Sequence, residues 1–170
     1  MTSTSNATRI FAGFIAGALA VLIFHQGMYV LMQTEGLPLR GAPYRLTPTP
    51  LWPELFGMFK LAAISVPGIV HQSIWGGLWG ILFAFLVDRI PGGPAIVKGF
   101  VFGVVFPMLL GSWLLVPLIK GGAMFSGAFA KGGFNILALR NGFLLNGVAF
   151  GIGLGLLYPL LARMMSGRRA

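Results

Sequence analysis

Four long apolar stretches dominate the pattern of hydrophobic and polar positions along this sequence. They cover about residues 10–31, 65–87, 97–119 and 139–161. The hydrocarbon core of a membrane is about 30 Å thick, and a helix needs about 20 apolar residues to cross it. Each stretch meets that length, so the pattern predicts an all-α membrane protein, a bundle of four transmembrane helices. We expect residues 1–170 to form a single integral membrane domain.

The segments between these stretches predict different kinds of connection. Residues 88–95, DRIPGGPA, predict a tight turn, so the second and third spans should be antiparallel neighbours. Residues 52–63, WPELFGMFKLAA, place Pro53 at a first helical position and Glu54 near the positive helix end. Aromatic residues then recur at helical spacing, which predicts a short interfacial helix before the second span. For the Gly-rich residues 120–138, interfacial, re-entrant and mobile conformations all stay open.

Small residues recur at four-residue spacing in every span. Lipid tails give helices no hydrophobic reason to associate, so residues that let two backbones approach closely become important. The glycines with this spacing are Gly13, Gly17, Gly76, Gly80, Gly99, Gly103, Gly147, Gly151 and Gly155. They predict a compact bundle, with a further face left for a partner or a second copy. Pro107 should kink the third span, because it removes a backbone donor and crowds the preceding turn.

The composition supports a membrane protein. The chain is 56% hydrophobic and 9% charged, with a mean hydropathy of +0.87. Soluble domains carry about a quarter charged residues. The absence of cysteine excludes disulfides, thiolate metal sites and cysteine nucleophiles. The net charge of +9 comes from cations placed singly or in pairs between apolar runs. That placement indicates topology signals and contact with anionic lipids, and we expect no nucleic-acid binding.

The distribution of cations predicts the orientation. Six lie on each side of the predicted membrane, but those on the side of the termini are concentrated in short segments. They are Arg9, Arg89, Lys98, Arg163, Arg168 and Arg169. Because the positive-inside rule gives most weight to short loops near helix ends, we expect both termini on the cytoplasmic side of a bacterial inner membrane.

The strongly polar side chains inside the spans are predicted to share one depth. They are His25, Gln26, His71, Gln72, Ser112 and Asn146. With a rise of 1.5 Å per residue, His25 lies about 9 Å before the end of the first span and His71 about 9 Å after the start of the second. Ser112 and Asn146 fall at nearly the same depth in the other two spans. The sequence therefore predicts one polar layer in the outer leaflet.

Three uses of this layer stay open at this point. The side chains could cross-link helices by hydrogen bonds, each contributing about 1 kcal/mol or less. His25 and His71 could ligate a haem b iron axially, hold another metal, or bind a quinone carbonyl. A small transporter or channel could pass its substrate along Gln72, Ser112 and Asn146. No catalytic motif accompanies these residues, and we expect no enzymatic activity.

The positions of these residues around their helices favour cross-linking of helices by hydrogen bonds. At about 100° per residue, Gln72 lines up with Gly76 and Gly80, whereas His71 is about a quarter of the circumference away from Gln72. The tightest interface of the second span should thus hold the glutamine, with the histidine at its flank. Outside the layer, Arg140 lies near the start of the fourth span and is a candidate for contact with lipid headgroups.

Several stretches together carry a resemblance to a known group of proteins. They are AGFIAGALA at 12–20, the His-containing start of the second span with GGLWG at 76–80, the Pro/Gly turn, and GFVFGVVFP at 99–107. This layout resembles small bacterial inner-membrane proteins of the YagU type and related four-helix families. The resemblance implies a fold and a location, but no site. We expect a non-enzymatic accessory or self-associating subunit of a membrane complex, in contact with membrane lipids.

Overall fold

Four long helices dominate the structure. The computed structural model describes residues 5–35, 40–41, 44–45, 58–61, 64–119, 121–126, 129–130 and 133–167. Within these ranges, four helices are long and apolar enough to cross a membrane, and we call them spans 1 to 4. They are Asn6–Met32, Gly68–Leu86, Ala95–Ile119 and Ile136–Met165. The prediction of four membrane-length helices is confirmed, with ends that differ from the predicted bounds by a few residues.

Three of the spans change from α-helix to π-helix along their length. Span 1 consists of α1 (Asn6–Leu19), η1 (Ala20–His25) and α2 (Gln26–Thr34), whereas span 2 is the single helix α4 (Gly68–Leu86). Span 3 consists of α5 (Ala95–Gly103), η2 (Val104–Leu115) and α6 (Val116–Ile119). Span 4 consists of α7 (Ile136–Gly142), η3 (Phe143–Gly151) and α8 (Ile152–Met165). Around Pro107, where the sequence predicts a kink, the helix has widened into η2.

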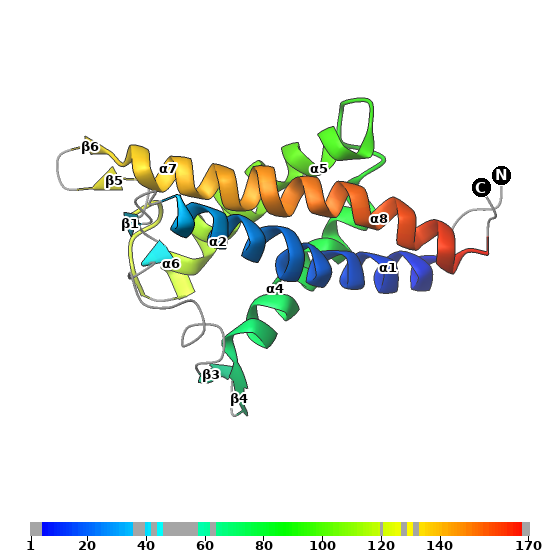
Figure 1. The fold of residues 1–170 in the computed structure, drawn as a ribbon, viewed down its shortest axis with the longest axis horizontal. Helices are drawn as coiled ribbons and strands as arrows, with labels where there is room; N and C mark the ends of the chain where they lie inside the picture. The colour runs from blue at the N-terminus through cyan, green and yellow to red at the C-terminus, as the bar shows by residue number, and fades with distance from the viewer. Residues whose placement is uncertain are drawn as a thin grey trace.

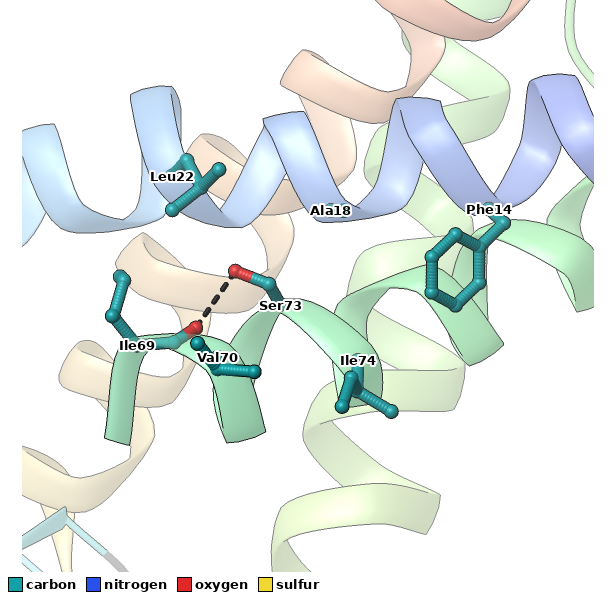
Figure 2. Close-up of a pocket in the computed structure, with 7 residues that line it drawn as sticks. All are labelled: Phe14, Ala18, Leu22, Ile69, Val70, Ser73 and Ile74. Atoms are coloured by element: carbon teal, nitrogen blue, oxygen red, sulfur yellow. Dashed lines mark hydrogen bonds between the residues drawn. The ribbon is translucent and has the colours of Figure 1, made fainter. Parts of the chain in front are cut away.

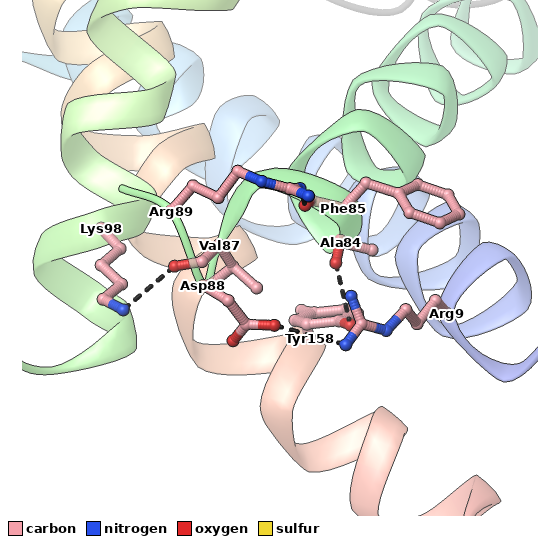
Figure 3. A network of polar contacts seen from close by, with 8 residues as sticks. All are labelled: Arg9, Ala84, Phe85, Val87, Asp88, Arg89, Lys98 and Tyr158. Atoms are coloured by element: carbon pink, nitrogen blue, oxygen red, sulfur yellow. Dashed lines mark hydrogen bonds and ion pairs between the residues drawn. The ribbon is translucent and has the colours of Figure 1, made fainter. Parts of the chain in front are cut away.

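The spans form two antiparallel pairs that meet along spans 1 and 4. Span 2 packs on span 1, span 3 packs on span 4, and spans 1 and 4 lie side by side (Figure 1). Because successive spans run in opposite directions, both ends of the chain lie at the end of the bundle that holds the turn 87–94. There, Nη2 of Arg9 is 3.3 Å from Oδ2 of Asp88, and this ion pair ties span 1 to the turn (Figure 3).

Basic side chains also cap the carbonyl end of α4 at this turn. Nζ of Lys98 donates to the backbone oxygen of Val87 at 3.0 Å, and Nη1 of Arg89 donates to that of Phe85 at 2.7 Å (Figure 3). The last carbonyls of a helix have no partner within it and carry its negative dipole end, so cations stabilise this position. The contact from Lys98 also joins span 3 to span 2, as expected for antiparallel neighbours joined by a short turn.

Glycines bring the backbones of each pair into contact. In the first pair, spans 1 and 2, a Cβ atom added at Gly13 would lie 2.6 Å from the carbonyl oxygen of Gly80. A Cβ atom added at Gly17 would overlap the carbonyl oxygen of Gly76. In the second pair, a Cβ atom added at Gly99 would overlap the carbonyl oxygen of Gly151. All nine glycines of the predicted packing set are buried. The four-residue spacing of the glycines predicts close approach of the backbones, and this approach joins the two helices of each pair.

Aromatic rings fill the space between the two pairs. Phe83 of span 2 lies edge-to-face on Phe102 of span 3, with ring centroids 5.2 Å apart, and on Tyr158 of span 4, at 5.7 Å. Trp79 also reaches Phe102, at 6.5 Å. These contacts come from the C-terminal half of α4. Its N-terminal half diverges from spans 3 and 4, as the lower part of Figure 1 shows.

Short antiparallel hairpins occur outside the spans, and one of them corrects a prediction. Strand β3 (Met58–Leu61) pairs with β4 (Ile64–Pro67), so a helix over 52–63 is wrong for the four residues of β3. The rest of that predicted helix, 52–57 and 62–63, lies outside the described residues. Ile64 and Val66 favour extended backbone, and the proline that follows Val66 restricts it further. A short helix without tertiary packing is marginal, so these preferences prevail.

Two smaller hairpins complete the described elements. Strand β1 (Arg40–Gly41) pairs with β2 (Tyr44–Arg45), and β5 (Phe129–Ala130) pairs with β6 (Gly133–Phe134). The second of these gives the predicted loop 120–138 some regular structure. After it, the side chain of Asn135 accepts a hydrogen bond from the backbone N–H of Ala138 at 3.1 Å and caps α7.

Candidate functional site

The two glutamines of the predicted polar layer meet between spans 1 and 2. Nε2 of Gln26 donates a hydrogen bond to Oε1 of Gln72. Gln26 is buried, and Gln72 lies one turn before Gly76, where the two backbones touch. As the helices separate beyond this glycine contact, the glutamine side chains are long enough to bridge the gap. Part of the predicted layer is therefore a polar link between two helices.

Ser112 and Asn146, two further residues of the layer, donate hydrogen bonds to backbone carbonyls of their own spans. Oγ of Ser112 donates to the carbonyl oxygen of Pro107 at 3.0 Å, and Nδ2 of Asn146 donates to that of Gly142 at 3.2 Å. Both side chains are buried, and both lie in π-helical segments, η2 and η3. In an apolar environment, a backbone carbonyl of the same helix is the partner nearest at hand for a buried polar side chain. These hydrogen bonds therefore satisfy Ser112 and Asn146 within their own spans.

His71 does not face the span that carries His25. His25 ends η1, which contacts both η3 of span 4 and α4 of span 2. In α4, Gly76 and Gly80 contact span 1, and at 100° per residue His71 is about 140° and 180° away from them. His71 thus faces away from span 1. Axial haem ligation needs two imidazoles on opposite sides of one iron. A haem held between spans 1 and 2 by His25 and His71 does not fit this arrangement.

His71 belongs instead to a partly exposed face of span 2. His71, Trp75 and Leu78 follow one another at i, i+4 and i+7, so they lie on one side of α4. Trp75 is 36% exposed, Leu78 is 50% exposed, and His71 is partly exposed. We call these three residues the span 2 outer face. They lie in the half of α4 that diverges from spans 3 and 4 (Figure 1).

Near the start of span 4 lie Arg140 and Asn141, two polar residues that the sequence places outside the predicted layer. Asn141 is fully buried, and its Oδ1 accepts hydrogen bonds from Nε and Nη2 of Arg140 at 3.2 and 2.8 Å. Arg140 was predicted to contact lipid headgroups, and it is half-buried here. The signal in the sequence was an amide next to a cation at the entrance of an apolar span, where a charge needs a polar partner.

Comparisons with known proteins assign no family. No family model matches the chain, and neither a curated protein nor a solved structure matches it. The resemblance to the YagU type stays a prediction.

The link between the glutamines predicts coupled effects on stability. We expect Gln26→Leu and Gln72→Leu to be coupled by about 0.6 kcal/mol, and by no more than about 1.7 kcal/mol, because interhelical hydrogen bonds in membranes have these values. Denaturation of the two single variants and the double variant in micelles measures the coupling.

The matched control is Ser73→Ala, since the hydroxyl of Ser73 donates to the backbone oxygen of Ile69 in its own helix at 2.7 Å. It should show no coupling to Gln26→Leu. Additive effects of the two glutamine replacements would contradict a link between the spans.

Proposed function

We propose that this chain is a multi-pass protein of a bacterial cytoplasmic membrane that acts without catalysis, as an accessory or self-associating subunit of a membrane complex. The observation that supports this most directly is the span 2 outer face, formed by His71, Trp75 and Leu78. It combines an imidazole with two large apolar side chains, on the half of α4 that diverges from spans 3 and 4 (Figure 1).

The spacing of the residues on this face fits a partner helix. The three residues lie three, seven and ten positions after Gly68, which places them about 5 to 15 Å below the end of span 2. Anchors at i, i+4 and i+7 are the spacing with which one helix docks against another protein.

The remaining polar residues support a structural role. Gln26 and Gln72 link two spans, and Ser112 and Asn146 donate hydrogen bonds to the backbone of their own spans. Each of these four candidates thus has a described role in holding the chain together. Such structural roles agree with a subunit that acts without catalysis in a membrane complex.

The orientation forms part of the proposal. Both termini lie at one end of the bundle, together with Arg9, Arg89, Lys98 and Arg163. Positively charged residues in short segments near helix ends are retained on the cytoplasmic side. We therefore place this end, with the ion pair of Figure 3, in the cytoplasm.

Cysteine cross-linking tests the partner face. The chain contains no cysteine, so Leu78→Cys introduces its sole thiol. We expect oxidation in native membranes to give a disulfide-linked dimer if the chain self-associates. A heterobifunctional thiol–amine reagent should give a discrete larger band if a different subunit covers the face. Electrophoresis followed by mass spectrometry of the band distinguishes the two cases.

The matched control is Ile23→Cys in span 1. The side chain of Ile23 is 55% exposed, and that of Leu78 is 50% exposed. Ile23 lies about 14 Å before the end of span 1, and Leu78 lies about 15 Å after the start of span 2, so the two are at similar depths. It should give a weaker cross-link than Leu78→Cys. Equal cross-linking of the two variants, with a chain that purifies as a monomer from native membranes, would overturn the proposal.

A further inference from the structure

An apolar groove of about 240 Å³ runs along the outside of the first helix pair. Phe14, Ala18 and Leu22 of span 1 form one wall, and Ile69, Val70 and Ile74 of span 2 form the other (Figure 2). The groove lies on a different side of α4 from the span 2 outer face, since Val70 is about 100° from His71 around the helix.

The length of the groove matches one leaflet of a bilayer. Its mouth is at Ile69, next to the first residue of α4, Gly68. Its inner end is closed by the ring of Phe14, which packs closely on Gly77. A Cβ atom added at Gly77 would lie 2.5 Å from Cε2 of this ring. Gly68 and Gly77 are nine residues apart, or about 14 Å along the helix. This is about half of the 30 Å hydrocarbon core.

The walls offer no free hydrogen-bonding group along this length. Ser73 is the polar residue among the described lining residues, and its hydroxyl donates to the carbonyl oxygen of Ile69 at 2.7 Å (Figure 2). Leu22 and Val70 are each about two-fifths exposed, so the groove is open sideways to the membrane. An occupant must therefore be apolar, narrow and about one leaflet long. An acyl chain has these properties.

The β3–β4 hairpin, which includes Lys60, lies next to the mouth of the groove. Strand β4 leads directly into α4, and Lys60 on the adjacent strand β3 is paired with Ser65, three residues before Gly68. The whole chain carries 12 Lys and Arg residues against three acids. A lysine at headgroup level favours anionic lipids.

We propose that this groove binds one acyl chain of an anionic phospholipid from the leaflet on the side of the β3–β4 hairpin. The headgroup then lies at the hairpin that carries Lys60, and the chain end rests on Phe14. The proposal depends on the four spans crossing a membrane, and it does not depend on a partner at the span 2 outer face.

Native mass spectrometry of the protein in mild detergent, with added phosphatidylglycerol or phosphatidylcholine, tests this site. We expect one phosphatidylglycerol to stay bound at collision energies that strip the others. Ala18→Trp fills part of the groove and should weaken binding of this lipid about tenfold. This is the effect expected when about two methylene groups of the acyl chain no longer contact the protein. Val70→Trp at the open mouth serves as a second blocking variant in case Ala18→Trp folds poorly. Lys60→Gln should reduce the preference for phosphatidylglycerol and leave binding of phosphatidylcholine unchanged.

The matched control is Ile23→Trp, which adds the same bulk one residue from Leu22 but outside the groove. It should retain the lipid. The site is wrong if both blocking variants keep the lipid at the wild-type level, or if Ile23→Trp loses it equally. A wild-type protein that does not prefer phosphatidylglycerol would refute the role of Lys60. If the blocking variants dissociate a dimer and lose no lipid, a second copy occupies the groove and the lipid proposal fails.

Discussion

Replacing Gly17 by alanine is expected to destabilise the protein by about 1–3 kcal/mol, the usual cost of forcing extra volume into a packed core. The added Cβ atom would overlap the carbonyl oxygen of Gly76 and lie 3.0 Å from Cα of Gly80. Both are backbone atoms, so relief requires the two helices to move apart. Alanine favours a helix over glycine by up to about 1 kcal/mol, which offsets part of this cost. Reversible unfolding in mixed micelles, followed by circular dichroism, measures the difference.

Gly27→Ala provides the matched control in the same span. Among the described residues, no atom beyond its local backbone lies within 4 Å of a Cβ atom added at Gly27, and Gly27 is exposed. The replacement should be neutral or stabilising by up to about 1 kcal/mol, because only helix propensity changes. A Gly17→Ala protein as stable as Gly27→Ala would show that the backbones of spans 1 and 2 do not meet at this glycine.

The replacement Asn141→Leu is expected to cost about 1.5–3 kcal/mol, the range for hydrogen bonds that involve a charged group. Asn141 is fully buried and accepts two hydrogen bonds from the half-buried guanidinium of Arg140. Leucine keeps the approximate volume but leaves the half-buried cation without this acceptor. The same unfolding measurement in micelles detects the loss.

A double variant separates this interaction from simple repacking. Asn141→Leu combined with Arg140→Met should cost less than the sum of the two single replacements, since the cation that loses its Asn141 acceptor is then absent. Arg163→Met serves as a control, because Arg163 is an exposed cation in the same span, and it should change stability little. Strictly additive effects of the first two replacements would contradict the pairing of Arg140 with Asn141.

The sequence predicted the four long helices because their signal is local. An apolar run of about 20 residues must satisfy its own backbone hydrogen bonds in lipid, and a helix does this within one segment. The packing glycines were also accessible from sequence, since their spacing places them on one face. Gln72 was correctly placed near the glycine interface by the same periodicity, and its contact with Gln26 follows from that position.

Other features were missed because they depend on non-local contacts or on competing local preferences. The hairpin β3–β4 replaces part of an expected interfacial helix, where aromatic spacing suggested a helix but Ile64 and Val66 prefer extended backbone. The π-helical segments change which side chains align, and the α-helical period does not reveal them. The matched depths of His25 and His71 suggested that they face each other, but depth does not fix direction around a helix.

By itself, the sequence determined the number of membrane-length helices, their approximate ends and the glycines that allow close approach, because these depend on short stretches and a fixed helical period. Only the tertiary structure decided that span 1 lies between spans 2 and 4, that half of span 2 diverges, and that Asn141 pairs with Arg140 inside the bundle. The order of helices depends on which surfaces fit one another in space. Many pairings of apolar helices have similar hydrophobicity, so the choice among them rests on packing between residues far apart in the chain.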